Sequence, residues 1–214
     1  MAFLAGFLAT VLGIALTFGI ESRINAHKRA KTAHLLALQI VEKMDQTYQQ
    51  LHEYLEIYDS IDSTSMCLHL AIMADTLERV DENVAENFLV NSLSEYVQAD
   101  IDDGMDTYKT EILNTIGDIE LIGHIDQFYY YAHQCAKVSE QVISQKRIVA
   151  DIVYSRFYGM ANPVTNWDYV RFLHDLPEYN VFYSRLQSVR YPLKEGEKLM
   201  LAELDACKEI LKVN

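Results

Sequence analysis

The sequence predicts an all-α protein in which a single N-terminal transmembrane helix continues into a long stalk helix. This stalk packs with a second long helix and shorter helices in a helical-bundle head. Three observations predict this class: the first twenty residues carry no charged side chain, apolar residues recur at helical spacing, and only 8 Gly and 3 Pro interrupt 214 residues. The composition is 50% hydrophobic and 23% charged, which suits one domain with a sizeable core and an accessory segment.

The opening segment from Ala2 to Ile20 is read as an uncleaved membrane anchor. At about 1.5 Å per residue it can cross most of a ~30 Å hydrocarbon layer. A secretion signal would carry basic residues before a shorter apolar core, and here none precedes it. A buried helix of a soluble protein is the remaining alternative, but such helices are seldom apolar on every face over this length.

A basic cluster follows the anchor and sets its expected orientation: Arg23, Lys28, Arg29 and Lys31. The positive-inside rule keeps such a cluster in the cytoplasm, so the large C-terminal domain is expected there. The same four side chains form a juxtamembrane collar that contacts lipid headgroups.

The cysteine content indicates the redox compartment of the protein, and the net charge indicates which partners it can bind. Three cysteines without CxxC spacing, Cys67, Cys135 and Cys207, suit a reducing compartment, and each is expected to be a small buried hydrophobe. The chain has a net charge of −13 and its first 31 residues carry +3, so the remainder carries −16. An acidic head excludes nucleic acid as a partner, because nucleic-acid binding needs a basic surface.

Small side chains recur every four residues along the anchor: Ala5, Ala9, Gly13 and Thr17. In lipid, helices associate by close backbone approach, and a ridge of small residues permits it. We therefore expect the anchor to self-associate and the protein to form a homo-oligomer.

The rest of the chain is predicted to be helical with few interruptions. Residues 30–58 form the stalk, residues 60–65 a polar break, and residues 66–80 and 83–97 two further helices. Gly117 and Gly123 indicate a hairpin corner. A long helix then covers residues 125–160 and is expected to pair with the stalk. Breaks at Pro177 and Pro192 separate three last helices, at residues 167–174, 179–191 and 193–213. The predicted divisions are an anchor at 1–22, a collar and stalk at 23–60, and an acidic head at 61–214.

Two stretches carry a loose resemblance to a known family. The matching positions are Gly13, Ile14, Glu21, Asn25, Lys28, Arg29, Tyr108, Leu113, Gly117, Ile119, Leu121, Ile122, Tyr129 and Tyr130. In these positions the chain resembles a family of single-span, helical membrane proteins of the Bacteroidetes type, a domain of unknown function. The resemblance covers about a third of the chain and implies a single-pass protein of a bacterial inner membrane, with no known reaction.

No catalytic, cofactor or metal motif stands out. The acids from Asp100 to Glu111 imitate a calcium loop, but Gly104 occupies position 5 where an EF-hand needs it at position 6. The histidines lack the spacing of zinc or di-iron ligands, and there is no phosphate loop or nucleophile elbow. We therefore expect no enzyme activity and no cofactor, and a hydrolytic or metal enzyme is kept as a third hypothesis.

The predicted function is a single-pass, membrane-anchored, self-associating helical scaffold or sensing module that recruits a protein partner. The alternative is a membrane-perturbing effector whose anchors cluster when the head domain is triggered. Both hypotheses name the lipid bilayer and further copies of the chain as partners.

Overall fold

The computed structural model describes the backbone of residues 2–93, 118–158 and 164–213, and the side chains within these ranges from Ala26 to Lys212. In chain order the elements are α1 (Ala2–Met73), the short 3-10 helix η1 (Leu77–Arg79), α2 (Glu82–Leu93), α4 (Ile119–Phe157), α5 (Asn166–Asp175) and α6 (Pro177–Val213). The described residues contain no strand, so the all-α helical bundle is confirmed.

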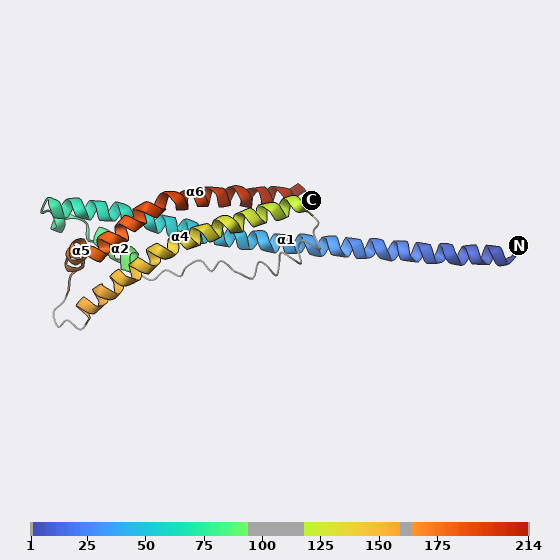
Figure 1. Cartoon of the computed structure of the whole chain (residues 1–214), viewed down its shortest axis with the longest axis horizontal. Helices are drawn as coiled ribbons and strands as arrows, with labels where there is room; N and C mark the ends of the chain where they lie inside the picture. Colours follow the sequence, from blue (N-terminus) through green and yellow to red (C-terminus); the bar gives the residue numbers. More distant parts are fainter. Residues whose placement is uncertain (1, 94–117, 159–163, 214) are drawn as a thin grey trace.

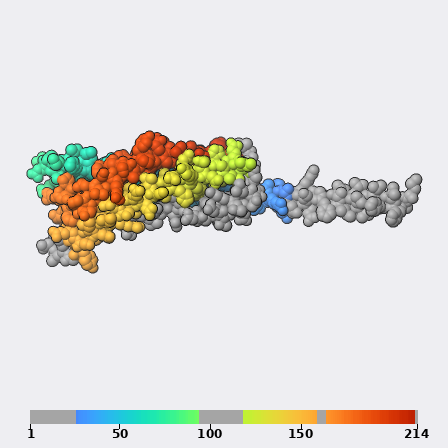
Figure 2. Space-filling model, viewed as in Figure 1, coloured from blue at the N-terminus to red at the C-terminus, as the bar shows by residue number. Residues whose placement is uncertain are grey.

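Three long helices, α1, α4 and α6, form the body of the bundle, and α2 and α5 lie at one end of it (Figure 1). The long helix α4 packs most extensively against α6, and α6 in turn packs against α1. The space-filling view shows α4 and α6 side by side along one face (Figure 2). The second long helix does contact the stalk helix α1, as expected, but its more extensive packing is against α6. The core between the three helices includes fully buried Met44, Phe128, Phe182, Leu186 and Leu204.

Helix α1 runs without interruption through residues 60–65, so the predicted polar break there is wrong. Ile61 is fully buried in the core, and Thr64 donates a hydrogen bond to the Ser60 carbonyl at 2.6 Å, as a helical residue can. On the same stretch, Asp59 and Asp62 face α6 and pair with basic side chains of that helix. Polar composition alone suggested a break, but contacts with α6 hold these residues helical.

Helix α1 ends instead at Met73, where backbone hydrogen bonds from the following residues cap its last carbonyl groups. The Thr76 N–H donates to the Ala71 carbonyl at 2.8 Å, and the Asp75 N–H donates to the Ile72 carbonyl at 3.1 Å. Asp75 has a φ of 52°, the left-handed conformation that this cap requires. Aspartate tolerates that conformation better than most residues, which explains why the chain turns here without a glycine.

Helix α6 continues through Pro192, so the prediction of two helices separated by this proline is wrong. Arg190 and Lys194 lie on either side of the proline, and both donate to Asp59 of α1, each at 2.7 Å. Leu193 is buried in the core between them. Because both flanking turns are anchored to α1, the helix tolerates the hydrogen bond that proline removes.

The helices predicted at residues 83–97, 125–160 and 167–174 are found with shifted ends, whereas the helix predicted at residues 66–80 is not a separate element, because residues 66–73 belong to α1. The structure describes α2 to Leu93, and α5 covers the predicted segment and begins at a capping box made by Thr165 and Asp168. Helix α4 begins at Ile119, where the Asp118 side chain accepts a hydrogen bond from the Leu121 N–H at 3.1 Å. Gly123 therefore lies inside a helix and not in a turn.

Two histidine–glutamate pairs connect α6 to its neighbours. His52 of α1 lies 2.6 Å from Glu197, and His124 of α4 lies 2.6 Å from Glu203. The hydrogen bond with Glu197 raises the pKa of His52 above its ordinary value. A raised histidine pKa adds stability that is fully present at acidic pH and is lost as the pH rises through the folded-state pKa.

At Gly196, helix α6 lies close to Cys135 of α4. A Cβ atom added at this position would clash with the Cys135 sulfur of α4. Gly196→Ala gains helix propensity of about 1 kcal/mol, but forcing atoms into a packed interface costs about 1–3 kcal/mol. We expect a net loss of stability in the single variant, measured by urea unfolding.

The matched double variant tests this explanation. Cys135→Ala removes the sulfur that the new methyl group would meet, so Gly196→Ala should become neutral or stabilising in that background. The double-mutant cycle should give a coupling of about 1–3 kcal/mol. Additive effects of the two substitutions would contradict the close approach.

Candidate functional site

The residues predicted for anchor association lie in the N-terminal part of α1, whose backbone is helical. The side chains of Ala5, Ala9, Gly13 and Thr17, and of Arg23 in the collar, lie outside the described part of the structure. The other collar residues, Lys28, Arg29 and Lys31, are exposed. They precede Ala33, the first buried residue among the described side chains of α1. This part of the collar therefore lies outside the packed bundle.

Among the described residues, no helix is long and apolar enough to cross a membrane. The segment from Ala2 to Ile20 lies outside the described side chains, so the anchor stays a prediction. The calcium-loop imitation from Asp100 to Glu111 also lies outside the described residues. Within the described part of the chain, no group of three or more His, Cys, Asp or Glu residues is placed to hold a metal ion.

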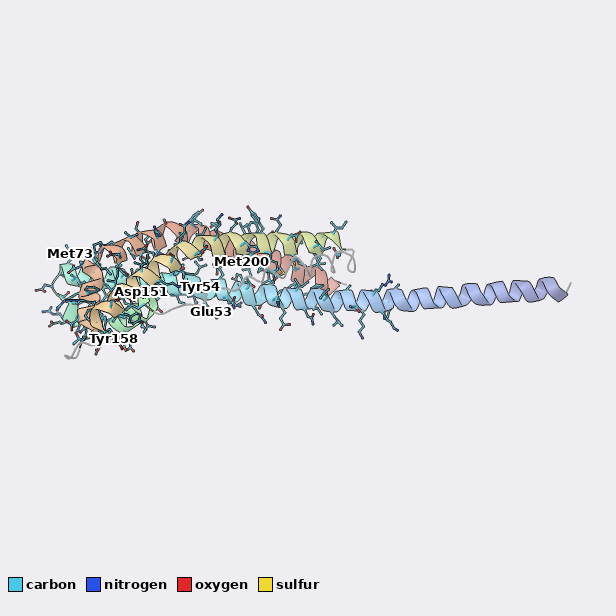
Figure 3. The ribbon with its side chains drawn as sticks, turned by 60° about the horizontal axis from the view of Figure 1, so that its bottom comes forward. Glu53, Tyr54, Met73, Asp151, Tyr158 and Met200 are labelled. Atoms are coloured by element: carbon cyan, nitrogen blue, oxygen red, sulfur yellow. The ribbon has the colours of Figure 1, made fainter. Side chains whose placement is uncertain are left out.

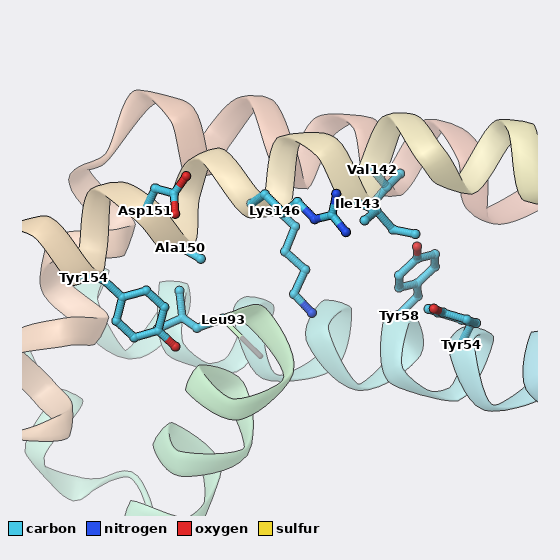
Figure 4. A pocket seen from close by; sticks show the side chains of 10 residues that line it. Tyr54, Tyr58, Leu93, Val142, Ile143, Lys146, Ala150, Asp151 and Tyr154 are labelled. Carbon is cyan, nitrogen blue, oxygen red and sulfur yellow. The ribbon is translucent and has the colours of Figure 1, made fainter. Parts of the chain in front are cut away.

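A cavity of about 390 Å³ lies between α1, α2 and α4 (Figure 4). Its walls are largely apolar or aromatic, and one lysine amine points into it (Figure 4). The lining residues are Tyr54 and Tyr58 of α1, Leu93 of α2, and Val142, Ile143, Lys146, Arg147, Ala150, Asp151 and Tyr154 of α4. We take this space, the Lys146 cavity, as the candidate functional site.

Lys146 lies on the buried face of α4. It is four residues after Val142 and three before Val149, and both of these valines are fully buried. The helix therefore directs the lysine toward α1 and α2, and its side chain is only 6% exposed. Burial lowers the pKa of Lys146 from 10.5 to about 7. An amine with this pKa is about half protonated at neutral pH.

The tyrosines give the cavity its second polar feature. Tyr58 is 2% exposed, and its hydroxyl interacts with the Ser139 side chain of α4. Burial raises the pKa of Tyr58 well above its ordinary value, so the hydroxyl stays protonated and can donate. The rings of Tyr54 and Tyr58 lie 6.4 Å apart at 57°, which forms an aromatic wall on α1.

The charged groups of the cavity differ in burial. Arg147 and Asp151 are exposed on α4, whereas Lys146 is buried. The Asp151 carboxylate points away from the Lys146 amine (Figure 4). Figure 3 places Asp151 and Tyr54 on the body of the bundle, away from the N-terminal part of α1. The cavity can therefore offer one buried cation and one buried hydroxyl donor to a small molecule with an apolar body.

A second cavity, of about 520 Å³, lies near α5 at the end of the bundle away from the N-terminus. His69 and His174 stack in its wall, with ring centroids 5.3 Å apart, and Phe88 and Tyr179 also line it. The two rings share a hydrogen bond of 3.1 Å between Nδ1 of His69 and Nε2 of His174. This cavity holds no lysine, arginine or carboxylate among its lining residues, so it offers less to a charged ligand.

Sequence reasoning missed Lys146, although a signal was present. The apolar positions assigned to the long helix included Val142, Val149 and Val153, and a lysine stood on the same stripe. A charged residue at a core position of an amphipathic helix is a candidate for a functional site. The contributions of α1 and α2 could not be predicted, because nothing in the sequence shows which helices meet.

Comparisons with known proteins add no identification: no protein family, no curated protein and no solved structure matches the chain.

Proposed function

We propose that this protein is a single-pass, membrane-anchored, self-associating helical module that senses or recruits a protein partner through its head. One observation carries this proposal: a single helix, α1, leads from the predicted anchor into the bundle (Figure 1). At about 1.5 Å per residue, its 72 residues span about 108 Å. A change in packing around α1 would therefore reach the anchor through one continuous rod.

The charge distribution supports an anchor that is close to a membrane surface. Lys28, Arg29 and Lys31 are exposed beyond the bundle and are free to contact anionic headgroups. The chain after residue 31 carries −16, so an anionic surface repels the head. These two effects together hold the bundle away from the bilayer while the collar stays near it.

Exposed apolar side chains support the recruitment of a protein partner. Met66, Leu70 and Met73 are spaced four and three residues apart, so they share one face of α1, and all three are exposed. Met73 lies at the end of the bundle farthest from the N-terminus (Figure 3). Apolar side chains grouped in this way are typical of protein interaction surfaces.

The ridge of small residues in the anchor is tested with Gly13→Ile. This substitution should block close helix approach and weaken self-association by about 1 kcal/mol or more, without preventing membrane insertion. Ala15→Ile is the matched control, because Ala15 lies on the opposite side of the helix from Gly13. Sedimentation of the full-length protein in detergent measures the association.

Three outcomes are informative. Weakened association in Gly13→Ile alone supports assembly through the anchor. Unchanged association in both variants would place oligomerisation in the head. A wild-type protein that stays monomeric at all concentrations and captures no partner would end the proposal.

A further inference from the structure

We propose that the second cavity, of about 520 Å³ and here called the His69 cavity, is a binding site for a neutral aromatic molecule whose N–H or O–H group donates to Nε2 of His69. This inference goes beyond the proposed function, because it assigns a ligand class to the head. It also stands apart from the anchor, because the described residues that line the cavity lie on α1, α2, α5 and α6 within the bundle.

The size and lining of the His69 cavity fit an aromatic ligand. Small-molecule sites usually measure about 300–1,000 Å³, with mostly apolar walls and a few placed polar groups. Leu68 and Ile72 of α1 and Val170 of α5 form an aliphatic part of the wall. The rings of Phe88 and Tyr179 meet at 71°, so the wall presents aromatic surfaces in two orientations. A further aromatic ring can pack edge-to-face or offset-stacked against such surfaces.

The polar groups of the wall indicate a neutral ligand. Among the described residues that line the cavity there is no lysine, arginine or carboxylate to offset the lost hydration of a charged ligand. Two tyrosine hydroxyls of the wall are already hydrogen-bonded within the protein. Tyr179 shares a 2.7 Å hydrogen bond with Ser65, and Tyr183 donates to Asp62 at 2.7 Å. Asn180 is exposed to water, so the two histidines are the polar groups most able to select a ligand.

A chain of hydrogen bonds determines which nitrogen of His69 can accept. Nδ1 of His174 lies 3.0 Å from the Asp175 carboxylate, and an ionised carboxylate only accepts, so this nitrogen carries a proton. In the neutral ring, Nε2 of His174 is then an acceptor, and the Nδ1–H of His69 donates to it at 3.1 Å. Nε2 of a neutral His69 is therefore left as an acceptor.

This arrangement favours a ligand that donates a hydrogen bond. The two histidine rings lie 5.3 Å apart between centroids and hold each other, and Asp175 holds His174, so little side-chain ordering is needed on binding. A ligand N–H or O–H can replace water at Nε2 of His69 while the aromatic ring packs in the cavity. An isostere without this donor would displace the water and leave Nε2 without a hydrogen bond, which weakens binding.

The test uses the purified full-length protein in lipid nanodiscs, labelled with 5-fluorotryptophan. Trp167 is the only tryptophan of the chain and precedes Val170 by three residues on α5, so one fluorine NMR signal reports on this part of the bundle. Indole is the probe, and benzofuran is its isostere, in which oxygen replaces the N–H group. Titrations are made at about pH 8, where free imidazole is neutral. Empty nanodiscs correct for probe that partitions into lipid.

Two variants are compared, each with a matched control. His69→Phe keeps a ring and removes the acceptor, and His133→Phe is its control because His133 is exposed on α4. Ile72→Phe places a larger side chain in the wall of the cavity. Ile148→Phe is its control, because Ile148 is exposed and is not among the residues that line the cavity.

We expect indole to bind with a Kd of about 1 mM or tighter, as a ligand of this size does in a formed pocket. Benzofuran should bind about fivefold more weakly, because it makes one hydrogen bond fewer. In His69→Phe this preference for indole should disappear. Ile72→Phe should weaken the binding of both probes about tenfold, because it fills the space that they need. Both control variants should bind like the wild type.

The proposal is overturned if indole and benzofuran bind the wild type equally, if His69→Phe keeps the preference for indole, or if neither probe shifts the signal. The comparison of the two probes in the wild type needs no substitution, so it stands even where a variant fails to fold. None of these outcomes depends on the anchor, because the assembly test changes Gly13. Loss of indole binding in a protein that still self-associates, or the reverse, separates the failure of one proposal from the failure of the other.

Discussion

Replacement of Lys146 by methionine should stabilise the protein by about 5 kcal/mol at pH 6 and by only about 2 kcal/mol at pH 9. The folded-state pKa of Lys146 is about 7. It is lower than the unfolded value of 10.5, so the unfolded state binds the proton more tightly. Each unit of pKa difference corresponds to about 1.4 kcal/mol. The destabilisation is therefore complete below pH 7 and disappears as the pH rises toward 10.5.

Urea unfolding of both proteins across this pH range gives the difference directly, since other titrating groups cancel between them. Lys137→Met should show no such pH dependence, because Lys137 is exposed on the same helix. A difference between wild type and Lys146→Met that stays constant with pH would show that the amine is not desolvated in the folded state.

Tyr179→Ala should lower the free energy of unfolding by about 3–5 kcal/mol, because this ring joins three helices. Its hydroxyl shares a 2.7 Å hydrogen bond with Ser65 of α1, and its ring meets Phe88 of α2 edge-on at 5.7 Å between centroids. On its own helix it packs against Phe182 at 5.6 Å. Truncation leaves a cavity that α1, α2 and α6 share.

Two further variants separate the ring from its hydroxyl. Tyr179→Phe keeps the packing and loses one hydrogen bond, so it should cost about 1 kcal/mol. Tyr191→Ala, at an exposed position on the same helix, should change stability by less than about 0.5 kcal/mol. Equal effects of Tyr179→Ala and Tyr191→Ala in thermal unfolding would contradict the assigned role of Tyr179.

The helical class could be predicted because it depends on local patterns. Scarce Gly and Pro and apolar residues at helical spacing predicted the long helices, and α5 appeared within about one residue of its predicted ends. Helix ends were harder to predict when contacts between helices determined them. Ser60 to Ser65 and Pro192 look like interruptions in isolation, but Asp59 of α1 and its partners on α6 hold both segments helical.

Contacts between helices also determine which single residues are buried, and the sequence alone did not show this. Cys67 was expected to be buried but is exposed, because it lies outside the buried stripe of α1 that includes Ile61, Leu68 and Ala71, whereas Cys135 and Cys207 are buried as predicted. The pairing of long helices was also beyond the sequence, since α1, α4 and α6 all carry apolar stripes. The Lys146 cavity depends on that pairing of helices. The sequence could therefore have pointed to the lysine at a core position, but not to the cavity around it.

The exposed Cys67 provides a native probe for the central proposal, that α1 joins a membrane anchor to a cytoplasmic head. Burial raises the pKa of Cys135 to about 11 and of Cys207 to about 12, so both thiols should be inert toward maleimide at neutral pH. Cys67→Ser serves as the control that shows the label is on Cys67. The experiment treats intact and permeabilised bacterial spheroplasts with a membrane-impermeant maleimide and then fractionates them.

We predict that the protein sediments with the membranes and that Cys67 reacts only after permeabilisation. Reaction in intact spheroplasts would place the head on the other side of the membrane and overturn the charge argument for its orientation. Recovery of the protein in the soluble fraction would contradict the anchor itself.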